Sequence, residues 1–315
     1  MSLPDSGQTG FAQSGSASVC AVLVTYHPDP ATLHAAAAAV RPQLDALVVV
    51  DNGPSGVSSV LGSLDVVVLE QDGNVGLAGA QNAGIAWARE HGHTHVLVLD
   101  HDSVPAPDMV ARLLDAERRL SAETRVAAVG PRFRDPREQR AAPFVRVAFP
   151  RSRKLWCDAS TPNIECDFLI SSGALIRLAV LDDVGDMDRG LFIDNVDLEW
   201  SFRARGKGYH LYGVCAAHMT HELGDAREPV LRGRAHVVRH GPQRLYFIMR
   251  NRITLYRRPY TPRVWIAQDV IRIPVKFLIF AVLVGPRARN VRYMTRGIVD
   301  GVRGRTGPCP IGPPQ

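Results

Sequence analysis

The stretch HVLVLDHDS, residues 95–103, is a short apolar run that ends in two aspartates separated by one residue. Runs of about four to eight residues rich in valine and leucine are typical of strands buried on both faces of a sheet. Three similar runs precede it in the chain: VCAVLVT (19–25), LVVVD (47–51) and VVVLE (66–70). The four runs predict the buried strands of one sheet.

Helical patterns separate these predicted strands. Six of residues 31–40 are alanine, residues 57–64 fit a short helix, and residues 76–91 carry Ala, Ile and Trp at helical spacing. Strands that alternate with helices are typical of βαβ units. We therefore expect an α/β fold with a mainly parallel central sheet flanked by helices.

Polar side chains follow every predicted strand. The four exits are Thr25-Tyr26-His27, Asp51-Asn52-Gly53, Gln71-Asp72-Gly73-Asn74 and Asp100-His101-Asp102-Ser103. Residues of these types also make turns and helix caps, so a single exit is ambiguous. Because ligands of open α/β sheets bind at the carboxyl ends of the strands, four polar exits together favour a binding site.

The last exit carries the sharpest chemical signal. Asp100 and Asp102 can turn two carboxylates toward one divalent cation, and such hard oxygen ligands suit magnesium or manganese. Neither GxGxxG nor GxxxxGK[ST] follows the first strand, which argues against dinucleotide oxidoreductases and P-loop NTPases.

Composition indicates a folded chain. Its 315 residues are 46% hydrophobic and 22% charged, which excludes disorder as the main state. The cysteines show no CxxC spacing, so we expect all of them to be reduced: Cys20, Cys157, Cys166, Cys215 and Cys309. Residues 1–18 lack the features of a secretory signal, so we expect a disordered leader on a cytoplasmic protein.

The net charge of +6 is unevenly distributed. From Arg250 to Arg305 there are thirteen basic residues and two acidic ones, a local +11 that leaves −5 for the rest of the chain. A basic tail on a mildly acidic body predicts an anionic surface for the tail and a separate task for the body. We therefore expect a leader over 1–18, a catalytic domain over 19–225 and a helical, basic C-terminal region over 226–315.

With these exits identified, the chain resembles the family 2 inverting glycosyltransferases of GT-A fold, and within them the bacterial rhamnosyltransferase branch. The matching segments occur in the family's order: VLVTYHPD (22–29), VVVDNG (48–53), NVGLAGAQNAGI (74–85), LVLDHDS (97–103), SSGALI (171–176), LFIDNVDLEW (191–200) and HMTHELGD (218–225). The resemblance implies a GT-A nucleotide-sugar-binding fold and transfer of a sugar from a nucleoside diphosphate to a hydroxyl.

The resemblance also implies roles for individual residues. Thr25 and Tyr26 match the wall around the nucleotide base, and Asp51, beside Asn52, matches the carboxylate that accepts from the pyrimidine imide. Asn74, Gly76 and Asn82 match a second nucleotide-side segment, in which Gln81 stands where many relatives have a basic residue. Asp100 matches the carboxylate near the ribose, Asp102 the one that holds the metal, and His221 a histidine near metal and diphosphate.

Inverting transfer also needs a base for the acceptor's proton, and one carboxylate can serve. Asp194 precedes a helix that we expect to begin near Asn195, and it is our first candidate, although it could instead cap that helix. Asp197 in the first turn is the second candidate. Glu199 stands four residues before Arg203, the spacing of a surface ion pair, so we expect it to be structural.

The remaining histidines are expected to have lesser roles. His93 and His95 lie at the edge of a predicted strand and should meet solvent. His218 and His221 could present two imidazoles on one side of a helix, but their segment is predicted to be a loop. Metal or diphosphate contact is therefore expected more for His221 than for His218.

Residues 274–285, PVKFLIFAVLVG, form the most apolar stretch. Twelve helical residues reach about 18 Å, short of the roughly 30 Å hydrocarbon core of a bilayer. Extension toward Val264 adds Asp269 and Arg272, each costing about 2.5–3.5 kcal/mol inside a membrane. We expect an amphipathic helix at an anionic membrane surface, at the inner face of the cell membrane, or alternatively a helix packed on the core.

The leading hypothesis is therefore a metal-dependent glycosyltransferase. Its expected donor is dTDP-L-rhamnose, with UDP-hexose or UDP-galactofuranose as alternatives, and its expected acceptor is a lipid-linked or cell-envelope glycan. A sugar-phosphate nucleotidyltransferase would need a Gly-rich basic loop after the first strand, where VTYHPDP stands. A nucleic-acid-binding module is disfavoured because the tail lacks regularly interleaved aromatic residues.

Overall fold

The computed structural model describes residues 17–311, apart from 139, 159, 222–225 and 231–234. Residues 1–16 of the expected leader therefore lie outside the described residues. The strands are β1 (Val19–Thr25), β2 (Ala46–Asp51), β3 (Val67–Glu70), β4 (His95–Asp100), β5 (Ser103–Pro105), β6 (Val126–Arg134), β7 (Phe144–Arg146), β8 (Arg153–Leu155), β9 (Asn163–Cys166), β10 (Leu175–Arg177), β11 (His210–His221), β12 (Ala226–Val230) and β13 (Ala235–Arg239). The helices are α1 (Pro30–Val40), α2 (Ser58–Leu61), α3 (Gly76–Glu90), α4 (Met109–Ser121), α5 (Leu178–Val184), α6 (Val196–Gly206), α7 (Pro242–Tyr256), α8 (Arg263–Val282) and α9 (Arg287–Val302), with 3-10 turns at Arg41–Gln43 and Arg189–Leu191.

The four apolar runs form the parallel half of a central sheet. The order β3-β2-β1-β4 is parallel throughout, as the strand and helix alternation predicts. Thr25 pairs with Asp51, and Val24 pairs with Asp100. The register therefore brings the polar exits of β1, β2 and β4 to one edge of the sheet.

The second half of the sheet is mixed. β10 lies antiparallel between β4 and β6, β6 is parallel to β11, and both β5 and β9 run antiparallel to β11. His218 and His221 lie in β11, so the loop predicted for their segment is wrong: pairing with β5 and β6 extends the strand to His221. In that pairing His221 lies opposite Ser103.

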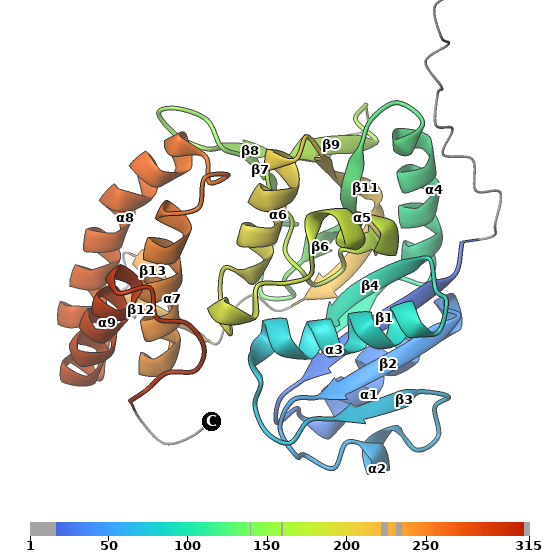
Figure 1. Ribbon diagram of the computed structural model, residues 1–315, viewed down its shortest axis with the longest axis horizontal. Helices are drawn as coiled ribbons and strands as arrows, with labels where there is room; N and C mark the ends of the chain where they lie inside the picture. The colour runs from blue at the N-terminus through green and yellow to red at the C-terminus, as the bar shows by residue number, and fades with distance from the viewer. Residues whose placement is uncertain (1–16, 139, 159, 222–225, 231–234, 312–315) are drawn as a thin grey trace, which may run out of the picture.

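Helices cover both faces of the sheet, and each face has its own apolar core. α1 and α4 pack against residues such as Ala21 and Leu23 of β1, while α3 and α6 pack on the opposite face. α3 approaches β1 so closely that a Cβ on Gly84 would lie 2.3 Å from Val22 Cγ1. The α/β fold with flanking helices predicted from the sequence is confirmed (Figure 1).

Two further expectations are wrong because the fold brings distant residues together. Cys157 and Cys215, 58 residues apart, form a disulfide with a Cα–Cα distance of 5.5 Å, so not all cysteines are reduced. Cys20, Cys166 and Cys309 are free. His95 is not at a solvent-exposed edge: it is buried, with its Nε2 3.7 Å from Glu117 of α4.

Helices α7, α8 and α9 lie together at one side of the sheet (Figure 1). α9 packs closely on α7, because a Cβ on Gly297 would lie 2.3 Å from the Tyr246 carbonyl oxygen. α8 is amphipathic, with buried Trp265 and Phe280 and a row of exposed apolar side chains. No helix within the described part of the chain combines the length and apolar character needed to cross a membrane.

Candidate active site

A cleft of about 560 Å³ opens at the carboxyl ends of β1 and β4. It is closed on the far side by the segment that precedes α6 and by the first turns of α7. Ten of the predicted site residues line it: Thr25, Tyr26, Asn52, Asn74, Gly76, Asp100, Asp102, Asp194, Asp197 and His221.

Asp100, Asp102 and His221 form a cluster in this cleft. One ligand atom of each lies within 4.8 Å of the others. His221 Nδ1 lies 3.1 Å from Asp102 Oδ1 and 2.9 Å from the hydroxyl of Ser103. The Ser103 hydroxyl lies in turn 2.6 Å from that of Ser172. The pairing of β5 with β11 therefore places a histidine beside two aspartates that are far away in sequence.

The charges of this cluster are coupled. Burial opposes ionisation of Asp102, but its hydrogen bond with His221 and the charge of that ring outweigh burial and lower the pKa of Asp102. Burial also opposes protonation of His221, yet the hydrogen bond with Asp102 and the charge of Asp100 raise the pKa of His221. For Asp100 burial dominates and raises the pKa.

This donor set fits a divalent cation. Two carboxylates and one imidazole face a common point, and the 3.1 Å between His221 Nδ1 and Asp102 Oδ1 matches neighbouring ligands of one ion. Ligands about 2.1 Å from an octahedral cation lie about 3 Å apart when adjacent. The cluster can therefore hold magnesium or manganese.

The nucleotide side of the cleft is organised by two asparagines. Asn52 Nδ2 donates to Asn74 Oδ1 at 3.0 Å, Asn52 Oδ1 accepts from the Val75 amide, and Asn74 Oδ1 accepts from the Gly76 amide. These bonds fix the start of α3, where Gly76 has a φ of +79°. The Thr25 hydroxyl is buried and has no partner among the described residues, which leaves it available to a ligand.

Two predicted nucleotide-side residues do not line the cleft. Asp51 is buried beneath it and accepts hydrogen bonds from the amides of Ser55, at 2.9 Å, and Gly53, at 3.4 Å. Asn82 forms reciprocal bonds with the backbone of Met187, so its amide joins α3 to that segment. In this conformation both side chains shape the site without reaching it.

The segment before α6 has an unusual backbone. Phe192, Asp194 and Asn195 have φ values of 65°, 63° and 63°, a left-handed region that is uncommon outside glycine. Such conformations persist where the surroundings hold them, and they concentrate at functional sites. The helix begins at Val196, as expected, and the strained segment turns Asp194 into the cleft.

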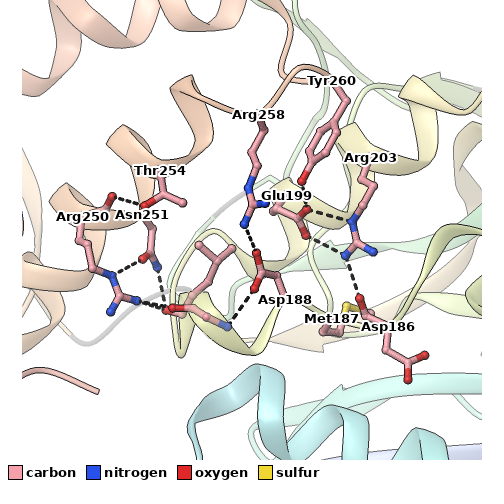
Figure 2. Close-up of polar contacts among 12 residues, drawn as sticks. Asp186, Met187, Asp188, Glu199, Arg203, Arg250, Asn251, Thr254, Arg258 and Tyr260 are labelled. Atoms are coloured by element: carbon pink, nitrogen blue, oxygen red, sulfur yellow. Dashed lines mark hydrogen bonds and ion pairs between the residues drawn. The ribbon is translucent and has the colours of Figure 1, made fainter. Parts of the chain in front are cut away.

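Helix α7 holds this segment in place. Asn251 Nδ2 donates to the carbonyls of Leu191, Ile193 and Asp194 at 2.7–2.9 Å. Buried Arg250 donates to the Gly190 and Leu191 carbonyls (Figure 2). The conformation of the segment therefore depends on residues about 60 positions later in the chain.

Asp194 and Asp197 differ in their surroundings. Arg244 Nε lies 3.2 and 3.3 Å from the carboxylate oxygens of Asp194, and burial raises the pKa of Asp194 while Arg244 offsets part of that rise. Asp197 has no ion pair with any described residue, and its Oδ1 accepts from the Leu198 amide. Burial, with the charges of Asp194 and Asp100, raises the pKa of Asp197 to about 6.

Glu199 is structural, as expected, but its environment differs from the prediction. Its carboxylate accepts two hydrogen bonds at 2.9 Å from Arg203 and a further one from the Tyr260 hydroxyl (Figure 2). The side chain is 1% exposed, so the pair is buried rather than on the surface. It links α6 to the turn between α7 and α8.

Sequence reasoning missed Arg244, Phe247 and Asn251, which line or support the cleft from α7. None of these three residues lies in a recognisable sequence motif. The only available signal was the high basic content that begins in this helix, and that signal indicated a surface instead.

Comparison with known proteins identifies the fold and family. The sequence model of glycosyl transferase family 2 matches residues 20–185. The structure resembles that of GalNAc-T7 with UDP, GalNAc and Mn²⁺, with a TM-score of 0.58 and 14% identity over 92% of this chain. This chain covers 57% of the GalNAc-T7 chain, and the likeness concerns the fold alone.

Two curated relatives are similar in sequence. The dTDP-rhamnosyl transferase RfbF of Shigella flexneri is 28% identical over 298 residues, which span 92% of this chain and 97% of that one. The polyprenol monophosphomannose synthase of Mycolicibacterium smegmatis is 27% identical over 58% of this chain and 69% of its own. The family resemblance inferred from the sequence is thus confirmed: the chain belongs to glycosyl transferase family 2 and is a glycosyltransferase.

Proposed function

We propose that this glycosyltransferase moves L-rhamnose from dTDP-L-rhamnose, with inversion, to a hydroxyl of a lipid-linked or cell-envelope glycan. The observation that carries the donor assignment is the 28% identity with a dTDP-rhamnosyl transferase along nearly the whole of both chains. UDP-hexose and UDP-galactofuranose remain the alternative donors. A nucleotide-sugar donor and a glycan acceptor are expected of the family.

A panel of nucleotide sugars tests the donor. We expect slow hydrolysis of dTDP-L-rhamnose in the presence of manganese or magnesium, at least about tenfold faster than hydrolysis of UDP-glucose, UDP-galactose or UDP-galactofuranose, because specific donor contacts are commonly worth about 1.4 kcal/mol or more. Release of dTDP is measured by chromatography. Consumption of a UDP-sugar while dTDP-L-rhamnose is ignored would overturn the donor and leave the reaction class intact.

The chain's own residues divide the work of this reaction. Asp100, Asp102 and His221 would hold a magnesium or manganese ion, whose chemistry is to neutralise the charge that develops on the departing diphosphate. The proposed nucleotide-side residues Thr25, Tyr26, Asn52, Asn74 and Gly76 bind and orient the donor in the cleft. Asp51 and Asn82 support that wall from beneath, and the buried hydroxyl of Thr25 supplies a free polar group.

Asp194 and Asp197 are the candidates for the base that takes the acceptor's proton. Burial raises the pKa of both carboxyls, that of Asp197 to about 6, which makes each a stronger base than an ordinary aspartate. The observation that favours Asp197 is that no described cation pairs with it. Asp194 shares its oxygens with Arg244, which reduces their availability for a proton. We therefore assign proton transfer to Asp197 and orientation of the cleft wall to Asp194.

We also propose that the protein acts as a peripheral protein at the inner face of the cell membrane, and that α8 makes the contact. Its apolar outer face is exposed, with 71% of Ile271 and 61% of Leu278 accessible, together with Val270, Val275 and Val282. Exposed arginines flank this face on α8 and α9, including Arg263, Arg287, Arg289 and Arg292. An apolar row beside cations complements an anionic bilayer surface.

Sedimentation with vesicles tests this contact. We expect binding to phosphatidylglycerol vesicles that weakens with salt, and about a tenfold or greater loss for Ile271→Asp, because an exposed isoleucine gains about 1.5–3 kcal/mol on burial. Val104→Asp makes the same change at an exposed apolar residue of β5 and should bind as the unaltered protein does. Equal binding of the Ile271 variant would exclude α8 as the contact.

A further inference from the structure

A second cavity, of about 490 Å³, shares a wall with the donor cleft. Asp194, Asn195 and Asp197 line both. On the other side of this wall the second cavity is bounded by α8, through Trp265 and Arg272. The two cavities therefore meet at the two candidate bases. A hydroxyl at this junction could give its proton to either base while it attacks the anomeric carbon of the donor sugar, and inversion requires that attack to come from the face opposite the diphosphate.

The walls of this cavity carry buried polar atoms without partners. The Asn195 amide oxygen and the Arg252 Nε are both buried, and neither hydrogen-bonds to any residue within the described ranges. Arg252 Nη1 pairs with Asp269, so one part of the guanidinium is anchored while Nε remains unused. Because buried polar groups are nearly always paired in folded proteins, these two residues favour a polar ligand, such as a sugar, in the cavity that they line.

Arg272 stands at the far end of the cavity, where it also lines a third hollow of about 450 Å³. Its Nη2 donates to Gln268 Oε1 at 3.1 Å. Gln268 is itself buried and held by bonds to the Ser152 hydroxyl and the Ala148 carbonyl. The guanidinium is thus positioned by a neutral amide, and within the part of the chain that the structure covers no carboxylate pairs with it.

Lys276 follows one turn later and lines the same third hollow. It also lacks a carboxylate partner among the described side chains. Burial and the nearby charges of Arg252 and Arg244 lower the pKa of Lys276 to about 8. A cation held in this way is stabilised by an anion that binds beside it.

Apart from these two cations and His240, the side chains that line the third hollow are apolar. Val238, Ile271, Val275, Ile279 and Phe280 line it, and Ile271 and Val275 also belong to the exposed face of α8. From the donor cleft outward, the order is therefore the candidate bases, the second cavity, Arg272 with Lys276, and the apolar part of the third hollow. Each part adjoins the next through a shared residue.

We propose that the second cavity is the acceptor site, and that Arg272 and Lys276 bind a phosphate group linking the acceptor sugar to an apolar chain that lies along α8. The inference rests on the proposed transfer to a lipid-linked glycan and names the residues that would recognise that acceptor. In such an acceptor the phosphate would lie beside Arg272 and Lys276, and the apolar chain would lie against the apolar residues of the third hollow. A neutral glycan would offer no negative charge to either cation.

Calorimetric titration of the full chain with farnesyl phosphate tests this. We expect Arg272→Ala and Lys276→Ala each to weaken binding about tenfold or more, the usual effect of losing a charge-assisted bond to phosphate. Arg263→Ala, on the same helix but outside both hollows, should bind as the unaltered chain does. Farnesol and inorganic phosphate should each bind more weakly, and excess glycerol 3-phosphate, a soluble lipid-headgroup analogue, should not displace farnesyl phosphate.

Three results would overturn the inference. They are unchanged binding in the Arg272→Ala, Lys276→Ala double variant, equal binding of farnesol, and displacement by glycerol 3-phosphate, which would make the cations a lipid-headgroup site. Hydrolysis of dTDP-L-rhamnose separates this test from the proposed function, because the double variant should retain it. Its loss together with binding would instead place the two cations at the donor diphosphate. Failure of the unaltered protein to hydrolyse the donor, with the binding pattern intact, would count against the donor alone.

Discussion

Replacing Asp102 with asparagine is expected to lower sugar transfer by about 100- to 1,000-fold or more, the usual effect of losing one preorganised group that stabilises transition-state charge. Asparagine keeps the shape of the side chain and removes its negative charge. Asp102 has the lowered pKa of the cluster and lies 3.1 Å from His221 Nδ1, so it is the ionised ligand on which the site depends. Binding of manganese, followed by electron paramagnetic resonance, should weaken in parallel.

Asp108→Asn is the matched control for this variant. Asp108 lies six residues later and pairs with Arg112 on the surface, where both side chains are about half exposed. Its replacement should change neither manganese binding nor transfer. Treatment of the unaltered protein with a chelator should reproduce the loss seen in the Asp102 variant. Full activity in excess chelator, or tight manganese binding by the variant, would mean that the cluster is not a metal site.

The sequence was most informative where local pattern and chemistry coincide. The apolar runs 19–25, 47–51 and 95–100 predict β1, β2 and β4 almost to the residue, because a strand buried on both faces admits little besides valine and leucine. The same pattern predicts where the polar residues after these strands lie, because the carboxyl ends of parallel strands meet at one edge of the sheet. The strand pattern alone therefore predicts the position of Asp100 and Asp102 at the edge of the sheet.

Residues that reach the cleft through packing could not be predicted in this way. Arg250 and Arg258 were counted in a basic tail, yet Arg250 is 1% exposed and binds the Gly190 and Leu191 carbonyls, and Arg258 pairs with Asp188. These two cations of the +11 segment thus bind groups of the protein itself. Its role depends on how α7 docks on the segment before α6, and no periodicity encodes that contact.

Contacts between residues that are far apart in sequence could not be predicted from local pattern either. Cys157 and Cys215 meet because β11 passes beside the segment after β8, and His221 meets Asp102 because β11 pairs with β5. Only the family resemblance suggested the second contact, and nothing suggested the first. Asp51 and Asn82 show the opposite case. Both lie in segments that match the family, but the Asp51 carboxylate and the Asn82 amide form hydrogen bonds with backbone groups beneath the cleft.

Asp197→Asn is expected to reduce transfer by about 100- to 10,000-fold, the range over which a positioned base contributes. In the unaltered protein kcat/KM should fall about tenfold per unit below pH 6, because only the ionised carboxylate can accept the proton and the pKa of Asp197 is about 6. The pH profile of the Asp197→Asn variant should not show this fall in kcat/KM. The Asp194→Asn variant should retain more activity and still show the fall, since Arg244 already binds the Asp194 carboxylate.

Stability separates a base from a merely structural carboxylate at this position. The folded-state pKa of about 6 lies above the ordinary value of 3.8, so the folded protein binds this proton more tightly than the unfolded chain does. The free energy of unfolding should therefore fall as pH rises from about 4 to 6, by up to about 3 kcal/mol, and the deficit should persist at higher pH. An asparagine side chain at this position carries no such charge, so the Asp197→Asn variant should unfold at higher denaturant concentration than the unaltered protein at pH 8 and at a similar one at pH 4. A variant that is inactive and also less stable at pH 8 would show that Asp197 supports the fold, and would return the role of base to Asp194.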